Sequence, residues 1–227
     1  MLTPKLPKAI LFDLDGVLID TEPLILQALK KTTKKYNIHL NNKQLESLKG
    51  RRKIDCAKQI YDWTKNKEFY NDLLDSKKNF LNIDLKMAKP FVGAIKLIKF
   101  CREINLPIAL VTSCGKEIFN LKKSANPFLN LFPTKILGDN ELIKEGKPAP
   151  DPYLIAAKTI GVETNQAWVV EDSYAGALSG LRAGCFLLFF SKNIKELNKL
   201  VTEFGNKKVI HLENLKELID FLKTNFK

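Results

Sequence analysis

The sequence predicts an α/β fold with a doubly wound, mainly parallel sheet and an all-α segment inserted near its start. From residue 91 onward, short apolar runs alternate with helical patterns, which is typical of parallel strands joined by right-handed crossovers. Residues 21–90, in contrast, show helical spacing and no pattern of a core strand. We therefore expect a discontinuous core of residues 1–20 and 91–227, and a helical domain of residues 21–90.

The first strand is predicted at residues 9–12, where an apolar run leads directly into Asp13 and Asp15. Because successive side chains of a strand alternate between its faces, both carboxylates begin on the same side. Gly16 then allows the backbone to leave the sheet. Two carboxylates at a strand end are costly unless a cation holds them, and a hard divalent ion is the obvious candidate. The alternative is an Asp-rich turn that caps the next helix.

Four helices are predicted in residues 21–90. Pro23 suits the first turn of a helix that continues to Asn37, and Asn42 is expected to cap a short helix that ends near Gly50. Two further helices carry apolar residues at helical spacing, over residues 54–61 and 69–80.

The later strands are predicted at residues 107–111, 134–137, 167–170 and 186–189, with a closing strand near 209–210 and an amphipathic final helix. The proline-rich loop at residues 146–152 precedes a helix, for which we expect Asp151 to be the cap and Pro152 to lie in the first turn.

The chain has 227 residues and a net charge of +12. Residues 21–90 hold 16 Lys and Arg against 8 Asp and Glu, so most of the net charge lies there. A solvated face accounts for many of these lysines. The sequence shows no nucleic-acid motif, so nucleic-acid binding is disfavoured, and a small phosphorylated metabolite is the better match for a local positive charge.

Cysteine usage and hydropathy indicate a cytoplasmic protein. The four cysteines are scattered without metal-ligand spacing, which favours a reducing compartment and packing roles. No apolar run approaches the roughly 20 residues of a membrane helix, and the first residues lack the layout of a signal peptide. We expect a monomer or weak dimer without a membrane partner.

Polar residues recur at the carboxyl ends of the predicted strands. Each could be an ordinary helix cap or surface residue, but together they provide what phosphoryl transfer needs: a nucleophile, a second acid, a hydroxyl, a cation and an acidic pair. The set consists of Asp13, Asp15, Thr112, Glu171 and Asp172 at strand ends, with Lys147 on a loop that leads to the same edge. The absence of a Walker loop and of G-x-G-x-x-G leaves nucleoside-triphosphate and dinucleotide binding without support.

These residues fall in four ordered motifs: Asp13–Thr21, Val111-Thr112-Ser113, Lys147–Asp151 and Val170–Ser173. In this the sequence resembles the haloacid dehalogenase superfamily, in the branch whose helical cap follows the first strand. The resemblance covers almost the whole chain and implies a Rossmann-like core. It implies that Asp13 is the nucleophile and a ligand of Mg²⁺, that Asp15 is the general acid and base and gives its backbone carbonyl to the metal, and that Thr112 and Lys147 clamp the phosphate together with Ser113. Asp172 would be a metal ligand and Glu171 a ligand or its neighbour.

Differences between branches of the superfamily favour a phosphatase. Dehalogenating members lack the second aspartate, which is present here as Asp15, and the phosphonate-cleaving branch has Ala where this chain has Leu14. The segment Gly50-Arg51-Arg52-Lys53 resembles the substrate-holding cap loop of β-phosphoglucomutase-like enzymes, and Lys78 lies in a segment like their cap lysine segment. Arg51, Arg52, Lys53 and Lys78 are therefore substrate-binding candidates, or solvated turn residues.

The resemblance implies a Mg²⁺-dependent phosphatase that acts on a small phosphate monoester, with a sugar or polyol phosphate favoured, through an aspartyl-phosphate. The alternative is a sugar-phosphate mutase, although Ile25 stands where the mutase has a histidine. An inactive, basic anion-binding or nucleic-acid-binding module is a third alternative, which the presence of every motif residue disfavours.

Overall fold

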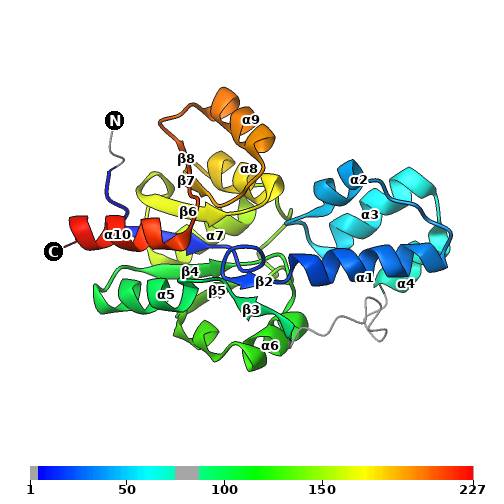
Figure 1. Ribbon diagram of the computed structural model, residues 1–227, viewed down its shortest axis with the longest axis horizontal. Helices are drawn as coiled ribbons and strands as arrows, with labels where there is room; N and C mark the ends of the chain where they lie inside the picture. Colours follow the sequence, from blue (N-terminus) through cyan, green and yellow to red (C-terminus); the bar gives the residue numbers. More distant parts are fainter. Residues whose placement is uncertain (1–4, 75–86, 227) are drawn as a thin grey trace.

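The computed structural model describes residues 5–74 and 87–226. Parallel strands form a six-stranded sheet in the order β5-β4-β1-β6-β7-β8, with β1 inside it (Figure 1). This arrangement confirms the predicted doubly wound α/β fold. The strands are β1 (Ala9–Phe12), β4 (Ile108–Val111), β5 (Thr134–Ile136), β6 (Ala167–Glu171), β7 (Phe186–Phe189) and β8 (Val209–His211).

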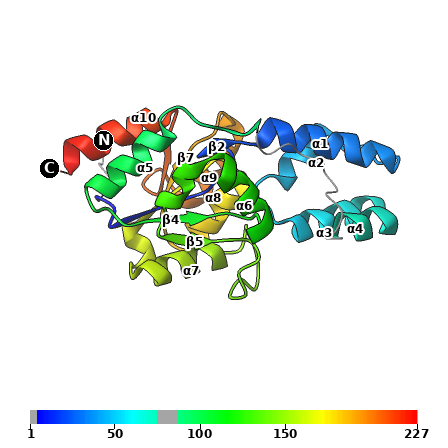
Figure 2. The same cartoon turned by 90° about the horizontal axis from the view of Figure 1, so that it is seen from below.

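Helices cover both faces of the sheet. Apolar side chains of α5, α6 and α10 pack with one face, and those of α7, α8 and α9 pack with the other. Figure 2 shows α5 and α10 on one side of the strands and α7 on the opposite side. The bounds are α5 (Ala94–Glu103), α6 (Lys116–Ala125), α7 (Asp151–Ile160), α8 (Tyr174–Arg182), α9 (Ile194–Phe204) and α10 (Leu215–Asn225), with short 3₁₀ helices η2 (Pro127–Leu131) and η3 (Thr164–Gln166).

The strand β1 is buried on both faces, as a central parallel strand must be. Ile10 and Phe12 belong to the apolar cluster under α5 and α10, whereas Leu11 belongs to the cluster under α7 and α8. The Asp13 N–H donates to the carbonyl of Val170 at 3.0 Å, so the pairing with β6 continues past the strand end. By strand alternation, Asp13 extends the face of Leu11, toward α7 and α8.

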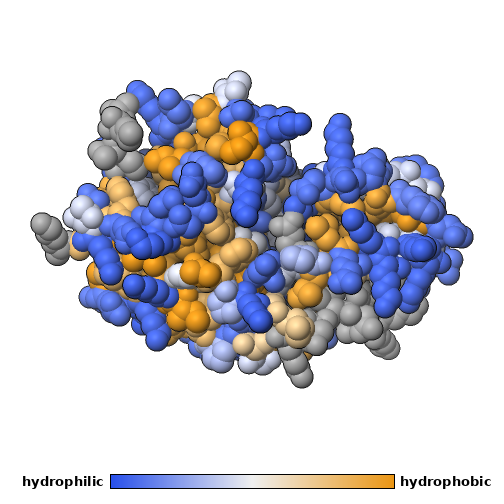
Figure 3. Space-filling model, viewed as in Figure 1, coloured by the Kyte–Doolittle hydropathy of each residue, from blue (hydrophilic) through white to orange (hydrophobic). Residues whose placement is uncertain are grey.

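Between β2 (Ile19–Asp20) and β3 (Lys89–Pro90) lies a helical insert, by which we mean α1 to α4. Its helices are α1 (Glu22–Lys35), α2 (Asn42–Leu48), α3 (Lys53–Thr64) and α4 (Lys67–Leu74). They pack around their own buried cluster, which includes Leu29, Ile60 and Phe69. The insert lies at one end of the molecule, and Figure 3 shows mainly hydrophilic residues over it. The two strands that lead into and out of it pair antiparallel.

Two predicted helix caps were wrong by one residue. Asn41, not Asn42, caps α2: its side chain accepts from the Gln44 N–H, and the Gln44 side chain accepts from the Asn41 N–H. This reciprocal pair requires Gln or Glu three positions after the cap residue. Gln44 lies three positions after Asn41, so Asn41 is the cap. Pro150 occupies the cap position of α7, and the Asp151 carboxylate instead accepts from the N–H groups of Lys144 and Glu145.

Part of the fourth predicted helix, near Phe80, lies outside the described residues. Of the helices in residues 5–74 and 87–226, none has the length and apolar character needed to cross a membrane.

Candidate active site

The centre of the site is the ammonium group of Lys147, whose side chain is 1% exposed. Its Nζ donates to Asp13 Oδ1 at 2.5 Å, to Glu171 Oε1 at 2.6 Å and to the carbonyl of Val111 at 3.0 Å. Asp13 directly follows β1, Glu171 is the last residue of β6 and Val111 is the last residue of β4. In the sheet, β1 lies between β4 and β6. The lysine therefore joins the carboxyl ends of three strands, as the sequence predicted for the candidate catalytic edge.

Glu171 is fully buried and held from several directions. The Tyr153 hydroxyl donates to its Oε1 at 2.8 Å, and Ser173 donates to its Oε2 from the hydroxyl at 3.1 Å. Gly176 makes room for this carboxylate, because a Cβ there would lie 1.8 Å from Oε1. Glu171 is therefore fixed, and it fixes Lys147 in turn.

Asp13, Glu171 and Asp172 form a carboxylate cluster, in which one oxygen of each residue lies within 4.8 Å of the others. Burial raises the pKa of Asp13 to about 8, an effect that Lys147 opposes and Glu171 strengthens. Asp172 lies against Gly16, which has φ +83° and whose added Cβ would be 2.0 Å from Asp172 Oδ2. Each of the three residues offers a carboxylate oxygen, the kind of ligand that hard divalent cations prefer, so such a cation fits this set of donors.

Thr112 follows β4 at the same edge and is buried. Its N–H donates to the carbonyl of Ile136, and its Oγ1 accepts from the Cys114 N–H at 3.2 Å. The next residue, Ser113, donates from Oγ to the carbonyl of Gly50 at 2.7 Å. Ser113 therefore connects this edge of the sheet to the helical insert.

Asp15 is outside this cluster of three carboxylates and is partly exposed, although its charge helps to raise the pKa of Asp13. Its Oδ1 accepts from the Thr21 hydroxyl at 2.5 Å, and Lys122 Nζ donates to both of its carboxylate oxygens at 2.7 Å. Burial lowers the pKa of Lys122, but the charges of Asp15 and Cys114 outweigh it and raise that pKa above its ordinary value. The ammonium is therefore charged beside Asp15.

The candidate residues of the insert take different positions. Arg52 pairs with Asp55 at 2.8 Å and lies against Gly146, since a Cβ on Gly146 would be 2.3 Å from Arg52 Nε. The Arg51 Nε is buried and has no hydrogen-bond partner among the described residues. Lys53 starts α3 and is exposed, and Lys78 lies outside the described residues.

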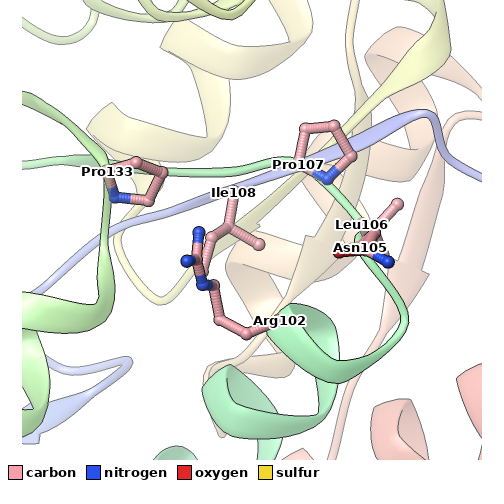
Figure 4. A pocket seen from close by; sticks show the side chains of 6 residues that line it. All are labelled: Arg102, Asn105, Leu106, Pro107, Ile108 and Pro133. Atoms are coloured by element: carbon pink, nitrogen blue, oxygen red, sulfur yellow. The ribbon is translucent and has the colours of Figure 1, made fainter.

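A small pocket lies at the opposite end of the sheet (Figure 4). Arg102, Pro107 and Pro133 line it together with Ile108, the first residue of β4. Thr112 follows the last residue of that strand, so this pocket is separate from the carboxylate cluster.

Sequence reasoning missed Tyr153, Ser173 and Lys122 as neighbours of the site. Tyr153 and Ser173 follow the motif lysine and the acidic pair by only a few residues, but nothing in the pattern reports their hydrogen bonds. Lys122 had a usable signal: it lies three residues after the buried Phe119, on the apolar stripe of its helix, where a lysine is out of place.

The parallel sheet with this acidic edge defines an α/β enzyme whose site lies at the carboxyl ends of the strands. The sequence pattern of a family described as haloacid dehalogenase-like hydrolase matches residues 10–190. The chain therefore belongs to the haloacid dehalogenase-like hydrolases and is an enzyme of the hydrolase class.

The curated proteins to which this chain is similar in sequence include phosphatases. Hexitol phosphatase A of Escherichia coli is 26% identical over 181 residues, which cover 80% of this chain and 82% of the relative. (DL)-glycerol-3-phosphatase 2 of Arabidopsis thaliana is 29% identical over 185 residues, covering 77% and 75%. Among solved structures, β-phosphoglucomutase from Clostridium difficile superposes with a TM-score of 0.77 at 22% identity, covering 97% of both chains; this last likeness concerns the fold.

The raised pKa of Asp13 predicts a stability effect in the metal-free protein. The folded-state pKa lies above the unfolded value, so ionising Asp13 costs folding free energy, and stability falls as the pH rises from about 4 to about 8. In the presence of a chelator, Asp13→Asn should escape this loss, and its advantage over the parent should grow by up to about 1.4 kcal/mol per pH unit.

Urea unfolding at a series of pH values between these limits measures the effect. Asp151→Asn, at the first residue of α7 and outside the carboxylate cluster, is the matched control and should show no growing advantage. A constant difference between Asp13→Asn and the parent across this range would contradict the assignment.

Proposed function

We propose that the protein is a Mg²⁺-dependent phosphatase that hydrolyses a small phosphate monoester, a sugar or polyol phosphate first among them, through an aspartyl-phosphate on Asp13. The observation that carries the proposal is the buried Lys147 between Asp13 and Glu171, beside Asp172. This arrangement provides a nucleophile, a phosphate-binding cation and metal-ligating oxygens within one hydrogen-bonded cluster. The names of the two phosphatase relatives support the class of substrate.

In the first step, Asp13 attacks phosphorus with the oxygen that Lys147 does not hold, Oδ2. The new bond to phosphorus forms as the ester P–O bond breaks, and the ester oxygen keeps the bonding electron pair. Asp15, in its protonated form, gives its proton to that oxygen, so that an alcohol leaves. Asp13 then carries the phosphoryl group as an acyl phosphate.

In the second step, water attacks the same phosphorus. Asp15, now a carboxylate, takes a proton from this water as its oxygen bonds to phosphorus. The bond between phosphorus and Asp13 breaks, and the Asp13 carboxylate is regenerated with release of inorganic phosphate. Asp15 holds its proton again, so the cycle closes without another reactant.

Charge on the phosphoryl oxygens is the main obstacle to attack by a carboxylate. Lys147 lies beside Asp13 and would bind one of these oxygens, and the hydroxyl of Thr112 and the backbone of Ser113 would hold others. Asp13, Asp172 and the backbone carbonyl of Asp15 are the proposed metal ligands, and Mg²⁺ bound there would neutralise the oxygens further. Glu171 acts mainly by holding Lys147, because both of its oxygens already accept hydrogen bonds.

We propose that residues 21–90 form a cap domain over the core, residues 1–20 and 91–227. The contact between Gly50 and Ser113 and the approach of Arg52 to Gly146 place the loop before α3 next to the candidate site. Arg51, Arg52 and Lys53 would add positive charge to the substrate side, in accord with the net charge of the segment. The β2–β3 pair is the natural hinge.

The first test is a panel of phosphorylated metabolites assayed with Mg²⁺ for both free phosphate and rearranged sugar phosphate. The proposal predicts free phosphate, which Asp13→Asn should reduce by at least about 10³-fold, since no nucleophile remains. Asp151→Asn is the matched control and should retain parental turnover. Parental hydrolysis by Asp13→Asn contradicts the proposal, and rearranged product from a hexose 1-phosphate would favour the mutase.

A second test addresses the contact between insert and core. Gly50 has φ +71°, and a Cβ there would lie 2.1 Å from Ser173 Oγ. Gly50→Ala should therefore lower kcat/KM for the best substrate by about tenfold or more, because it displaces the loop from the site. Steady-state assays with circular dichroism as a check of folding measure this.

Gly161→Ala is the matched control. Gly161 has φ +72°, so alanine there meets the same backbone strain, but nothing lies within 4 Å of the added Cβ. An equal loss of kcat/KM in both variants would mean that strain, and not the contact with the core, accounts for the effect.

A further inference from the structure

Lys122 carries a buried ammonium group at a position where packing does not require a charged side chain. Its side chain is 2% exposed, and its neighbour on the buried face of α6 is Phe119. An apolar residue at this position would fill the same space without the cost of removing an ammonium from water, which is several kcal/mol for an unpaired ion. Because a buried ion pair seldom improves on apolar packing, the presence of a lysine here points to a role other than stability.

Asp15 is the partner of this charge, and the contact is made through both carboxylate oxygens at 2.7 Å. The residues are 107 positions apart, so the contact depends on the folded core. The Thr21 hydroxyl adds a bond to Oδ1. A carboxylate has about four acceptor positions, so Oδ2 retains one after Lys122 is bound and Asp15 can still exchange a proton.

Hydrogen bonds near the Lys122–Asp15 pair reach both the segment that enters the insert and the segment that leaves it. Thr21 directly precedes α1. One turn after Lys122, at the C-cap of α6, buried Asn126 donates from Nδ2 to the carbonyls of Lys122 and Ala88, each at 3.2 Å. Ala88 directly precedes β3, so α6 is bonded to the returning segment, while Lys122 holds the carboxylate.

We propose that Lys122 is a positioning residue that holds the Asp15 carboxylate in the orientation from which it transfers protons. The inference rests on the proposed function, in which Asp15 gives a proton to the leaving oxygen and later takes one from water. Lys122 itself touches neither substrate nor phosphorus. It restricts rotation of a side chain for which Thr21, in the segment entering the insert, is the other hydrogen-bond partner among the described residues.

The test replaces Lys122 with Met, which has a similar length and no charge, and with Arg, which keeps a cation. We expect Lys122→Met to lower kcat on an alkyl phosphate by about 10²-fold, as misplacement of a catalytic group does, with KM changed by less than about twofold. Lys122→Arg should recover part of the loss. Lys123→Met, at the adjacent lysine near the ring of Phe119, is the matched control and should retain parental kcat.

A double-mutant cycle separates positioning from a general structural effect. If Lys122 acts through Asp15, adding Lys122→Met to Asp15→Asn should change the remaining kcat by less than about twofold. If Lys122→Met does not fold, as judged by circular dichroism and thermal unfolding, the same cycle is run with Lys122→Gln, for which the same result is expected.

Parental kcat in the folded Lys122 variants, or an equal loss in the parent and in the Asp15→Asn background, would overturn the inference. These outcomes leave the proposed function intact as long as the parent shows Mg²⁺-dependent hydrolysis that Asp13→Asn removes. A parent without such hydrolysis would overturn both.

Discussion

The hydrogen-bonded group around Lys147 is the interaction on which the rest of the site depends. Its ammonium, buried at the carboxyl ends of β1, β4 and β6, bonds to Asp13 and Glu171. Neither carboxylate could be buried so fully without it, and the lysine could not be buried without them. Tyr153 and Ser173 complete the bonds of Glu171, so the lysine has a single position. The proposed nucleophile, the proposed phosphate-binding lysine and the candidate metal ligands are therefore electrostatically coupled to one another.

Much of this was predictable because it follows from strand ends. Asp13, Thr112 and Glu171 come directly after or at the end of apolar runs, and parallel pairing must bring such residues to one edge. Lys147 was expected near this edge because its loop leads there, but its role as a phosphate clamp came only from the resemblance of its motif to the family. The pair of Lys122 and Asp15 was not predictable from local pattern, because its members lie 107 residues apart. The cap of α2 was wrong by one residue because two neighbouring asparagines satisfy the same preference, and the cap of α7 was wrong because the Asp151 carboxylate bonds to the preceding loop instead.

The helical insert packs around a cluster that is separate from the cores on the two faces of the sheet. Its helices pack around an apolar cluster of their own, whereas its contacts with the core include a glycine carbonyl bonded to Ser113 and an arginine against Gly146. The packing inside the insert is therefore independent of the chemistry at the sheet edge. Under the proposed function, side chains of the insert would select the substrate while the residues at the strand ends carry out the reaction.

The central claim is that Asp13 takes the phosphoryl group before water removes it. Rapid acid quenching of the enzyme during turnover with Mg²⁺ and a sugar phosphate, followed by mass spectrometry of its peptides, tests this most directly. The account predicts one added phosphoryl group on the peptide that contains Asp13, labile to hydroxylamine, and none in Asp13→Asn. A protein that hydrolyses the ester with no phosphorylated peptide at any quench time, or with the phosphoryl group on another residue, would contradict it.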